Sequence, residues 1–186
     1  HITKLLRANK VVGSFIEFCG EGVENLTVGD RATISNMAPE YGATAVLFPV
    51  DNSTLDYLKM TGRTDEEIQV VEEYSKNQKL WRRSDITPDY NRVLNLDLSS
   101  IEPCVSGPKN PEDKINLNKF SNEINTHSKM LYNQDLRPDE FEVPDLGYKI
   151  KDADIMIAAI TSCTNTANPK NVIAAGLVAK KLVELG

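Results

Sequence analysis

Apolar residues occur along the chain in short runs that alternate with helical patterns. Ile2, Leu5 and Leu6 have helical spacing, which predicts a helix near the start. The apolar runs at 11–18 and 43–48 are predicted strands, because each is short and is followed by Gly or Pro. This order of strands and helices is typical of an α/β protein.

Capping signals predict where three further helices begin. Thr27 and Asp30 form a capping box, in which Asp replaces the usual Glu, for a helix that extends to about Ala38. Pro39 makes the end of this helix irregular, because it lacks an N–H and crowds the carbonyl four residues back. Gly42 then ends the element. The two other signals are Ser53–Asp56, for a helix over 55–61, and Thr64–Glu67, for a helix to about Lys79.

The C-terminal part of the chain repeats the order of strand and helix. Residues 153–160 are apolar, like a strand buried on both faces. Asn168 is a predicted N-cap, and Pro169 is the first residue of a helix that extends to Leu185. Cys163 therefore lies in a strand-to-helix loop, where open α/β sheets tend to place their ligands.

A composition change divides the chain. Leu94, Leu96 and Leu98 alternate with polar residues, which predicts a half-buried strand. After this strand the sequence becomes rich in Pro, Asn, Ser and Lys, with little periodicity apart from one predicted helix near Phe120. We interpret this stretch as a connection between domains. The predicted boundaries are 1–98 for the first domain, 99–147 for the connection and 148–186 for the start of the next domain.

Composition and charge exclude several functions. The chain has 186 residues and a net charge of −6, with no long run of Lys or Arg. General attraction to nucleic acid or to anionic membranes is therefore not expected. No apolar stretch is long enough to cross a bilayer, and no secretory leader opens the chain. Because the chain begins with His1 and ends just after a predicted helix, we expect it to be a segment of a longer protein.

Three cysteines, Cys19, Cys104 and Cys163, are far apart in the sequence. Their odd number argues against a disulfide framework and fits a reducing compartment. No Cys-x-x-Cys pair occurs, and His1 and His127 are the only histidines, so spacing gives no complete zinc or iron–sulfur site. Any metal that Cys163 binds would need partners from outside this chain.

Cys163 is the first candidate for chemistry. The start of the helix after it offers N–H groups and a positive dipole end, which favour the thiolate that binds metals or attacks substrates. A single cysteine in a loop of small residues is, however, more often a buried and inert side chain. The local pattern leaves both interpretations open.

Asn36 and Glu40 are the second candidates. They are four residues apart, so a continuous helix would place them on one face near its end. A carboxylate at a helix C-terminus faces the negative end of the dipole, which raises its proton affinity and calls for a functional reason. A solvated Glu in a loose turn is the alternative.

Several segments resemble the aconitase family. The Ser-Cys-Thr-Asn sequence at 162–165 resembles the loop that supplies one of three cysteine ligands of a [4Fe–4S] cluster in that family. The Asn-Met-Ala-Pro-Glu sequence within 30–44 and the Val-Asp pair at 50–51 resemble the branch that contains bacterial aconitase A and the cytosolic iron-regulatory proteins. Further matching segments are 12–22, 54–58, 61–63, 101–103 and 106–109.

The resemblance implies a fold and a site. The fold would consist of aconitase-type three-layer α/β/α domains with mixed or parallel sheets, and this chain would span the second domain and the start of the third. Cys163 would be a ligand of the cluster, Glu40 would bond the hydroxyl or water on the substrate-binding iron, and Asn36 would lie beside the cluster. The other two cysteine ligands would lie beyond Gly186.

The implied activity is that of aconitate hydratase, a lyase of the citric acid cycle that interconverts citrate and isocitrate through cis-aconitate. The full-length protein would be a monomer without membrane contact, located in the cytoplasm, or in the mitochondrial matrix of a eukaryote. The segment alone would be inactive, because it carries one of three cluster ligands. Within the same class, the alternatives are iron–sulfur 2-methylcitrate dehydratase and homoaconitase. From another class, the cluster-free protein would bind RNA and regulate translation, although the negative charge argues against RNA.

Overall fold

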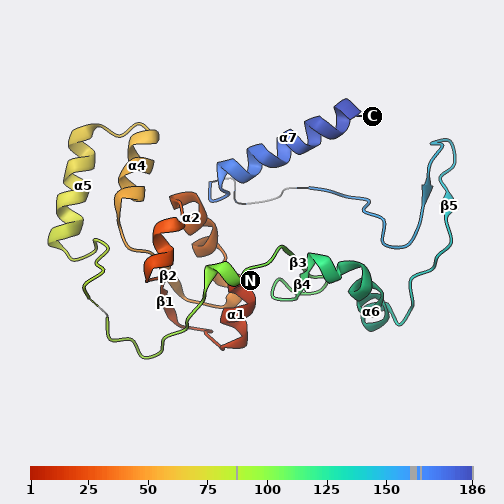
Figure 1. Cartoon of the computed structure of the whole chain (residues 1–186), viewed down its shortest axis with the longest axis horizontal. Coiled ribbons are helices and arrows are strands. Elements are labelled where there is room, and N and C mark those ends of the chain that lie inside the picture. Colours follow the sequence, from red (N-terminus) through yellow and green to blue (C-terminus); the bar gives the residue numbers. More distant parts are fainter. Residues whose placement is uncertain (87, 160–162, 164, 186) are drawn as a thin grey trace. The chain divides into compact units, whose positions relative to one another are not determined.

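The computed structural model describes residues 1–86, 88–159, 163 and 165–185 (Figure 1). The chain divides into two compact units. One, here called the helical unit, comprises residues 2–100 and 163–186, and the other, the hairpin unit, comprises residue 1 and residues 101–162. The domain boundaries that the sequence suggests at 98 and 147 stay predictions.

The helical unit is built around a parallel pair of strands. β1 (Phe15–Glu17) pairs with β2 (Ala45–Leu47), and the register is set by three residue pairs. Parallel strands need a crossover connection, and here it contains α2 (Val28–Asn36) and α3 (Ala38–Tyr41). The remaining elements of the unit are α1 (Ile2–Ala8), the 3₁₀ turns η1 (Glu21–Asn25) and η2 (Leu98–Ser100), α4 (Asn52–Met60), α5 (Asp65–Asn77) and α7 (Pro169–Leu185).

These elements confirm the α/β class, and two of the predicted capping boxes are confirmed in atomic detail. Thr27 Oγ1 accepts a hydrogen bond from the Asp30 N–H at 3.2 Å, and Asp30 Oδ2 accepts one from the Thr27 N–H at 3.0 Å. The box of Thr64 and Glu67 begins α5 in the same way. Each box satisfies backbone N–H groups that the first helical turn leaves without partners, so these helices begin where the sequence predicts.

A small core surrounds Tyr41. Leu6, Val11 and Tyr41 are buried together, and Tyr41 has no exposed surface. Its hydroxyl donates a hydrogen bond of 2.7 Å to the carbonyl of Ile34. Burial, together with the negative charge of Glu40, raises the pKa of Tyr41 to about 12. The core thereby fixes α3, the element that carries Glu40, against α1.

The start of α4 differs from the prediction. The N-cap is Asp51, whose Oδ1 accepts a hydrogen bond from the Thr54 N–H at 3.4 Å, and the helix begins at Asn52. The predicted cap at Ser53 and the predicted helix over 55–61 are therefore wrong at this end. Asp51 is the better cap because the guanidinium of Arg31 on α2 holds its carboxylate in place.

The hairpin unit contains strands that the sequence patterns did not predict. β3 (Cys104–Ser106) and β4 (Lys114–Asn116) pair antiparallel, and Ile115 at the centre of β4 is buried. α6 (Phe120–Tyr132) is the helix predicted near Phe120. The remaining elements are the 3₁₀ turn η3 (Leu117–Lys119) and the short antiparallel strands β5 (Phe141–Glu142) and β6 (Lys149–Ile150). Three-residue strands are too short to show a period of two.

Two predicted strands are wrong. Along 94–98 the leucines are half-buried and the residues between them exposed, as expected, but this stretch forms no strand and runs into η2. Residues 153–159 also form no strand, and Ile155 and Ile157 are 85% and 83% exposed. Residue 160, the last of that predicted strand, lies outside the described residues. An apolar pattern predicts which face is buried, but a strand also needs a neighbouring backbone to bond to.

Candidate functional site

One face of α2 contacts the segment that contains Cys163. Asp30, Thr33 and Asn36 are three residues apart on α2 and so lie along one face. Each forms a hydrogen bond with a residue between 163 and 168. The pairs are Asp30 with Asn168, Thr33 with Thr166, and Asn36 with Cys163. The two segments therefore run in opposite directions with three successive contacts, which we call the α2 ladder.

The last contact of the α2 ladder joins two of the predicted site residues. Asn36 Nδ2 donates a hydrogen bond of 2.9 Å to Cys163 Sγ across 127 positions of sequence. Both side chains are exposed. A donated hydrogen bond stabilises negative charge on the sulfur, which is the form that binds a metal. The exposure of Cys163 also contradicts the alternative of a buried, inert thiol.

The backbone around Cys163 forms a tight turn. Its φ of 52° lies in the left-handed region, which costs a non-glycine residue about 1–2 kcal/mol. Its carbonyl accepts hydrogen bonds from the N–H groups of Thr166 at 3.0 Å and Ala167 at 2.9 Å. Asn168 follows as the N-cap of α7, with Oδ1 3.0 Å from the Lys170 N–H, and this predicted cap is confirmed. The turn thus presents the thiol just before the helix begins.

Asp30 connects the capping box of α2 with the cap of α7. Its Oδ1 accepts a hydrogen bond of 2.8 Å from Asn168 Nδ2, while Oδ2 bonds to Thr27. Burial alone would raise the pKa of Asp30. The hydrogen bonds from Thr27 and Asn168, with the charge of Lys170, outweigh burial and hold this pKa below its usual range. Asp30 is therefore an ionised carboxylate when it accepts the hydrogen bond from the Asn168 amide.

Two further features of α2 favour close approach of the loop. Thr33 Oγ1 lies 2.7 Å from the Thr166 carbonyl oxygen and 2.9 Å from the Gly29 carbonyl oxygen, so its proton has two acceptors. Gly29 has no Cβ, and one built there would lie 3.1 Å from Asn168 Cγ. That distance is tighter than ordinary van der Waals contact. The glycine therefore makes room for Asn168.

Glu40 lies on α3, beyond a break in the predicted helix. α2 ends at Asn36, Met37 interrupts the helix, and Gly42 ends α3 with a φ of 82°. The predicted irregularity before Pro39 is confirmed, but Asn36 and Glu40 do not share one continuous helix. Glu40 Oε2 is buried and has no hydrogen-bond partner among the described residues. Such an atom costs about 1–3 kcal/mol, which argues against a solvated Glu in a loose turn.

Among the described residues, no group of three or more His, Cys, Asp or Glu side chains could hold a metal ion. Cys163 is one sulfur donor with an amide hydrogen bond, which fits one corner of an iron–sulfur cluster but not a complete site. Cys19 and Cys104 are exposed, and no disulfide joins the three cysteines. A single sulfur donor is compatible with such a cluster only if further ligands come from outside the described residues.

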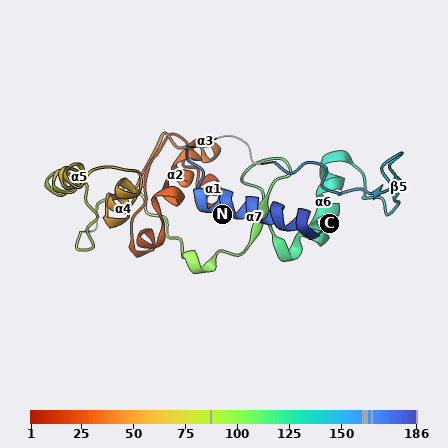
Figure 2. The same cartoon turned by 90° about the horizontal axis from the view of Figure 1, so that it is seen from above.

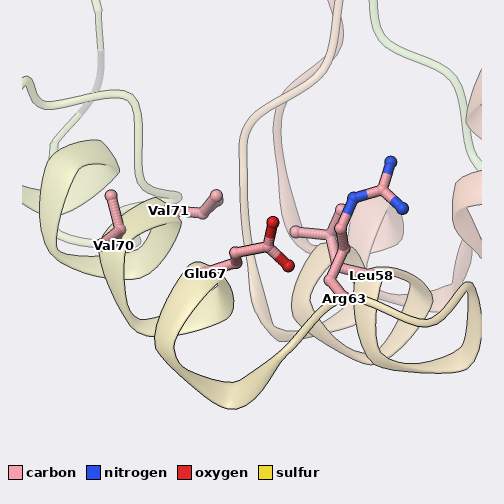
Figure 3. Close-up of a pocket in the computed structure, with 5 residues that line it drawn as sticks. All are labelled: Leu58, Arg63, Glu67, Val70 and Val71. Carbon is pink, nitrogen blue, oxygen red and sulfur yellow. The ribbon is translucent and has the colours of Figure 1, made fainter.

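The helices α4 and α5 pack against each other (Figure 1 and Figure 2). Residues of both helices and of the turn between them line a separate pocket. Figure 3 shows the carboxylate of Glu67 between Val71 and Leu58, and the guanidinium of Arg63 pointing away from the other side chains. Leu58, Val70 and Val71 line the apolar part. The Glu67 carboxylate also accepts the hydrogen bond from the Thr64 N–H in the capping box of α5, so this side chain has a structural role there. None of the predicted site residues lines this pocket.

The model of the aconitase family (aconitate hydratase) matches residues 1–186. The chain therefore belongs to the aconitase family. Similar proteins are the aconitate hydratases A of Rickettsia typhi, Legionella pneumophila and Escherichia coli, which are 49%, 47% and 42% identical. In each case the match covers 100% of this chain and 21% of the relative. The chain thus spans about a fifth of the length of the curated relatives it matches.

Sequence reasoning missed three residues of the α2 ladder as site residues. The local sequence pattern presents Asp30 and Asn168 only as helix caps, and it gives Thr33 no role. The available signal was the polar series Asp30, Thr33 and Asn36 at intervals of three, which indicates a polar stripe on α2. The stripe alone does not reveal its partner, because the partner segment lies about 130 positions away. That segment is a loop, so it has no periodic pattern that would match the stripe.

Proposed function

We propose that this chain is part of an aconitate hydratase, and that the contact between Asn36 and Cys163 belongs to its active site. The observation that carries the proposal is the 2.9 Å hydrogen bond between these residues. It joins the two segments that most resemble the family, although they are far apart in sequence. Membership of the aconitase family and the names of the relatives support the same activity.

We propose Cys163 as one of three cysteine ligands of a [4Fe–4S] cluster, with the others outside residues 1–186. Such a cluster supplies an iron with an open coordination position, which acts as a Lewis acid toward carboxylate and hydroxyl oxygens. Asn36 would stabilise the charge on the Cys163 sulfur through its donated N–H and fix the direction of the sulfur. With one of three ligands, the segment alone should not interconvert citrate and isocitrate.

Glu40 is the proposed group on the hydroxyl side of the reaction. Dehydration removes a hydroxyl from one carbon of citrate and a proton from the next, so the hydroxyl must gain a proton as it leaves as water. The buried Oε2 of Glu40 has a place for one hydrogen bond that the described residues leave unfilled. Glu40 would deliver a proton to the leaving hydroxyl, and the base that takes the carbon-bound proton is assigned to the part of the protein beyond this chain.

The substrate is proposed to be citrate or isocitrate. Homoaconitase and 2-methylcitrate dehydratase activities use closely related tricarboxylic acids, and no contact of the described residues distinguishes them. RNA binding by the cluster-free protein is not part of the proposal, because a net charge of −6 gives no general attraction to RNA. Within the described residues, no helix has both the length and the apolar character to cross a bilayer. Location in the cytoplasm or mitochondrial matrix and a monomeric state stay predictions.

The test is an assay of the complete protein after anaerobic reconstitution with iron and sulfide. Formation of cis-aconitate from citrate is measured with 2-methylcitrate and homocitrate in parallel. We expect rapid turnover of citrate that disappears when the cluster is removed. Turnover of 2-methylcitrate or homocitrate in place of citrate would change the substrate, and absence of all three activities with an intact cluster would refute the proposal.

A further inference from the structure

We propose that Gly29, Asp30 and Asn168 are positioning residues for Cys163. In this view their contact sets the register of the loop at 163–168 on α2 and so places the sulfur at position 36. The inference rests on the proposed role of Cys163 as a cluster ligand. It concerns only how this chain presents that ligand.

The contact between Asn36 and Cys163 is too weak to hold the loop by itself. It is a single hydrogen bond between two exposed side chains, and such a bond contributes about 1 kcal/mol at most. Fixing the backbone of even one residue costs about as much. The other contacts of the loop with α2 therefore contribute to its register.

Those other contacts are more protected from water. The hydrogen bond from Asn168 to Asp30 and the one from Thr33 to the Thr166 carbonyl are both part-buried. The first is charge-assisted, because its acceptor is a carboxylate, and bonds of this kind are stronger than neutral ones. It lies at the end of the α2 ladder opposite to Cys163. The loop is thus held at its far end and meets Asn36 at its near end.

Asn168 has two tasks, which require both a donor and an acceptor in its side chain. Its Nδ2 donates to Asp30 Oδ1, and its Oδ1 accepts from the N–H of Lys170 in the first turn of α7. An Asp at this position would still cap α7, but it would place a second carboxylate against Asp30. The requirement for a donor therefore belongs to the contact with α2 and not to the helix cap.

A substitution at Gly29 tests the same contact independently. Alanine favours a helix over glycine by about 1 kcal/mol, so Gly29→Ala should stabilise α2. The added Cβ would lie 3.1 Å from Asn168 Cγ and 3.4 Å from its Cα, so Asn168 would have to shift by a few tenths of an ångström. Gly29→Ala should therefore change the contact with the loop without lowering the stability of α2.

The experiment measures how close position 36 lies to Cys163. The chain carries Asn36→Cys and is treated, without iron, with a short bifunctional thiol reagent, and the cross-link between 36 and 163 is quantified by mass spectrometry. This background lacks the Asn36 amide, so it reports only the register of the loop. Exposed Cys19 and Cys104 serve as internal controls for reagent and accessibility.

Three variants are compared in this background. Asn168→Asp should lower the cross-link about tenfold, as expected when a charge-assisted hydrogen bond is replaced by two facing carboxylates. The double variant Asn168→Asp with Asp30→Asn places the amide donor at position 30 and the carboxylate acceptor at position 168. This exchange restores the hydrogen bond and should recover the cross-link to within about twofold of the parent. Gly29→Ala should lower it several-fold, while the helical circular dichroism signal is kept.

An unchanged cross-link in both Asn168→Asp and Gly29→Ala would overturn the positioning role. So would a loss in Asn168→Asp that the exchange with Asp30→Asn does not reverse. If Asn168→Asp alone unfolds the chain, the exchanged pair and Gly29→Ala decide the question. The assay contains no iron, so its outcome is independent of the cluster. Visible absorbance of the reconstituted complete protein tests the ligand role of Cys163 separately.

Discussion

Arg31 and Asp51 form a bidentate ion pair in the interior of the helical unit. The two N–O distances are 2.9 Å and 2.7 Å, and the side chains are 5% and 13% exposed. One guanidinium thereby joins α2 to the N-cap of α4. Its remaining hydrogen bonds go to the backbone carbonyls of Val23, Leu26 and Pro49. Arg31 is thus satisfied on all sides and determines where α2 lies relative to its neighbours.

Removal of one partner should destabilise this unit strongly. Asp51→Ala leaves the buried guanidinium without its counter-charge and removes the cap of α4, so we expect the free energy of unfolding to fall by about 3–5 kcal/mol. Urea unfolding followed by circular dichroism measures this change. The matched control is Asp85→Ala, which breaks the exposed pair of Arg83 with Asp85 and should cost about 1 kcal/mol or less. Equal losses in the two variants would contradict the assigned role of Arg31.

Tyr41 should make the folded state sensitive to alkali. Its pKa is raised from 10 to about 12, chiefly by burial and then by the charge of Glu40. The unfolded chain therefore loses this proton first, and the stability that the protonated Tyr41 provides is present below pH 10 and is lost as pH rises towards 12. In Tyr41→Phe the fall in unfolding free energy over this range should be smaller than in the parent. The pKa of Tyr90 is also raised, and this residue is present in both proteins. The difference in unfolding free energy between the parent and Tyr41→Phe at each pH therefore isolates the contribution of Tyr41.

Asp30 should make the folded state sensitive to acid, whereas Tyr41 makes it sensitive to alkali. Its pKa is held below the usual 3.8, because hydrogen bonds from Thr27 and Asn168 outweigh burial. The unfolded chain then binds this proton first as pH falls, so the contribution of Asp30 is present above 3.8 and is lost as pH falls through the lower value of the folded state. Asp30→Asn should flatten this part of the stability profile, measured by denaturant unfolding at a series of pH values. The same acid slope in both proteins would contradict the assignment.

Local chemistry explains which parts of the fold could be predicted from the sequence. The capping boxes at Thr27 and Thr64 and the cap at Asn168 depend on residues three or fewer positions away, so the pattern contains both partners. At the start of α4, Asp51 and Thr54 form a capping box three positions apart, and Arg31, 20 residues earlier, favours Asp51 over the predicted cap at Ser53 by holding its carboxylate. The predicted strand over 153–160 failed for a related reason, since an apolar run does not state whether a partner strand is present.

The candidate site shows the same limit. Residue chemistry singles out Cys163, Asn36 and Glu40 as candidates, but it leaves an inert alternative for Cys163 and for Glu40, and only the resemblance to a family assigns their roles. The structure brings Asn36 to Cys163, and it also reveals that Asp30 and Asn168 form a contact between the same two segments. That contact spans 138 positions. A single sequence contains no record of such pairing, because the two halves have unrelated local patterns.

Loss of the Cys163 sulfur should abolish the proposed cluster. Cys163→Ser in the complete protein replaces a thiolate with a hydroxyl, a poor ligand for iron in such clusters, so the visible absorbance after reconstitution should disappear. Cys104→Ser is the matched control, because that cysteine is exposed and lies in the hairpin unit. It should retain full absorbance. Retention of the absorbance in Cys163→Ser would refute the ligand assignment.

Glu40→Gln tests the chemistry without touching the cluster. The substitution keeps the size of the side chain but removes the proton that the carboxyl group can give to the leaving hydroxyl. General acid catalysis contributes about 10²–10⁴-fold, so kcat for citrate dehydration in the complete protein should fall by about that factor while the visible absorbance is unchanged. Because the buried Oε2 has no partner among the described residues, an amide there should be tolerated and unfolding stability should fall little. Unchanged turnover would remove Glu40 from the mechanism, whereas loss of absorbance would assign it to cluster binding instead.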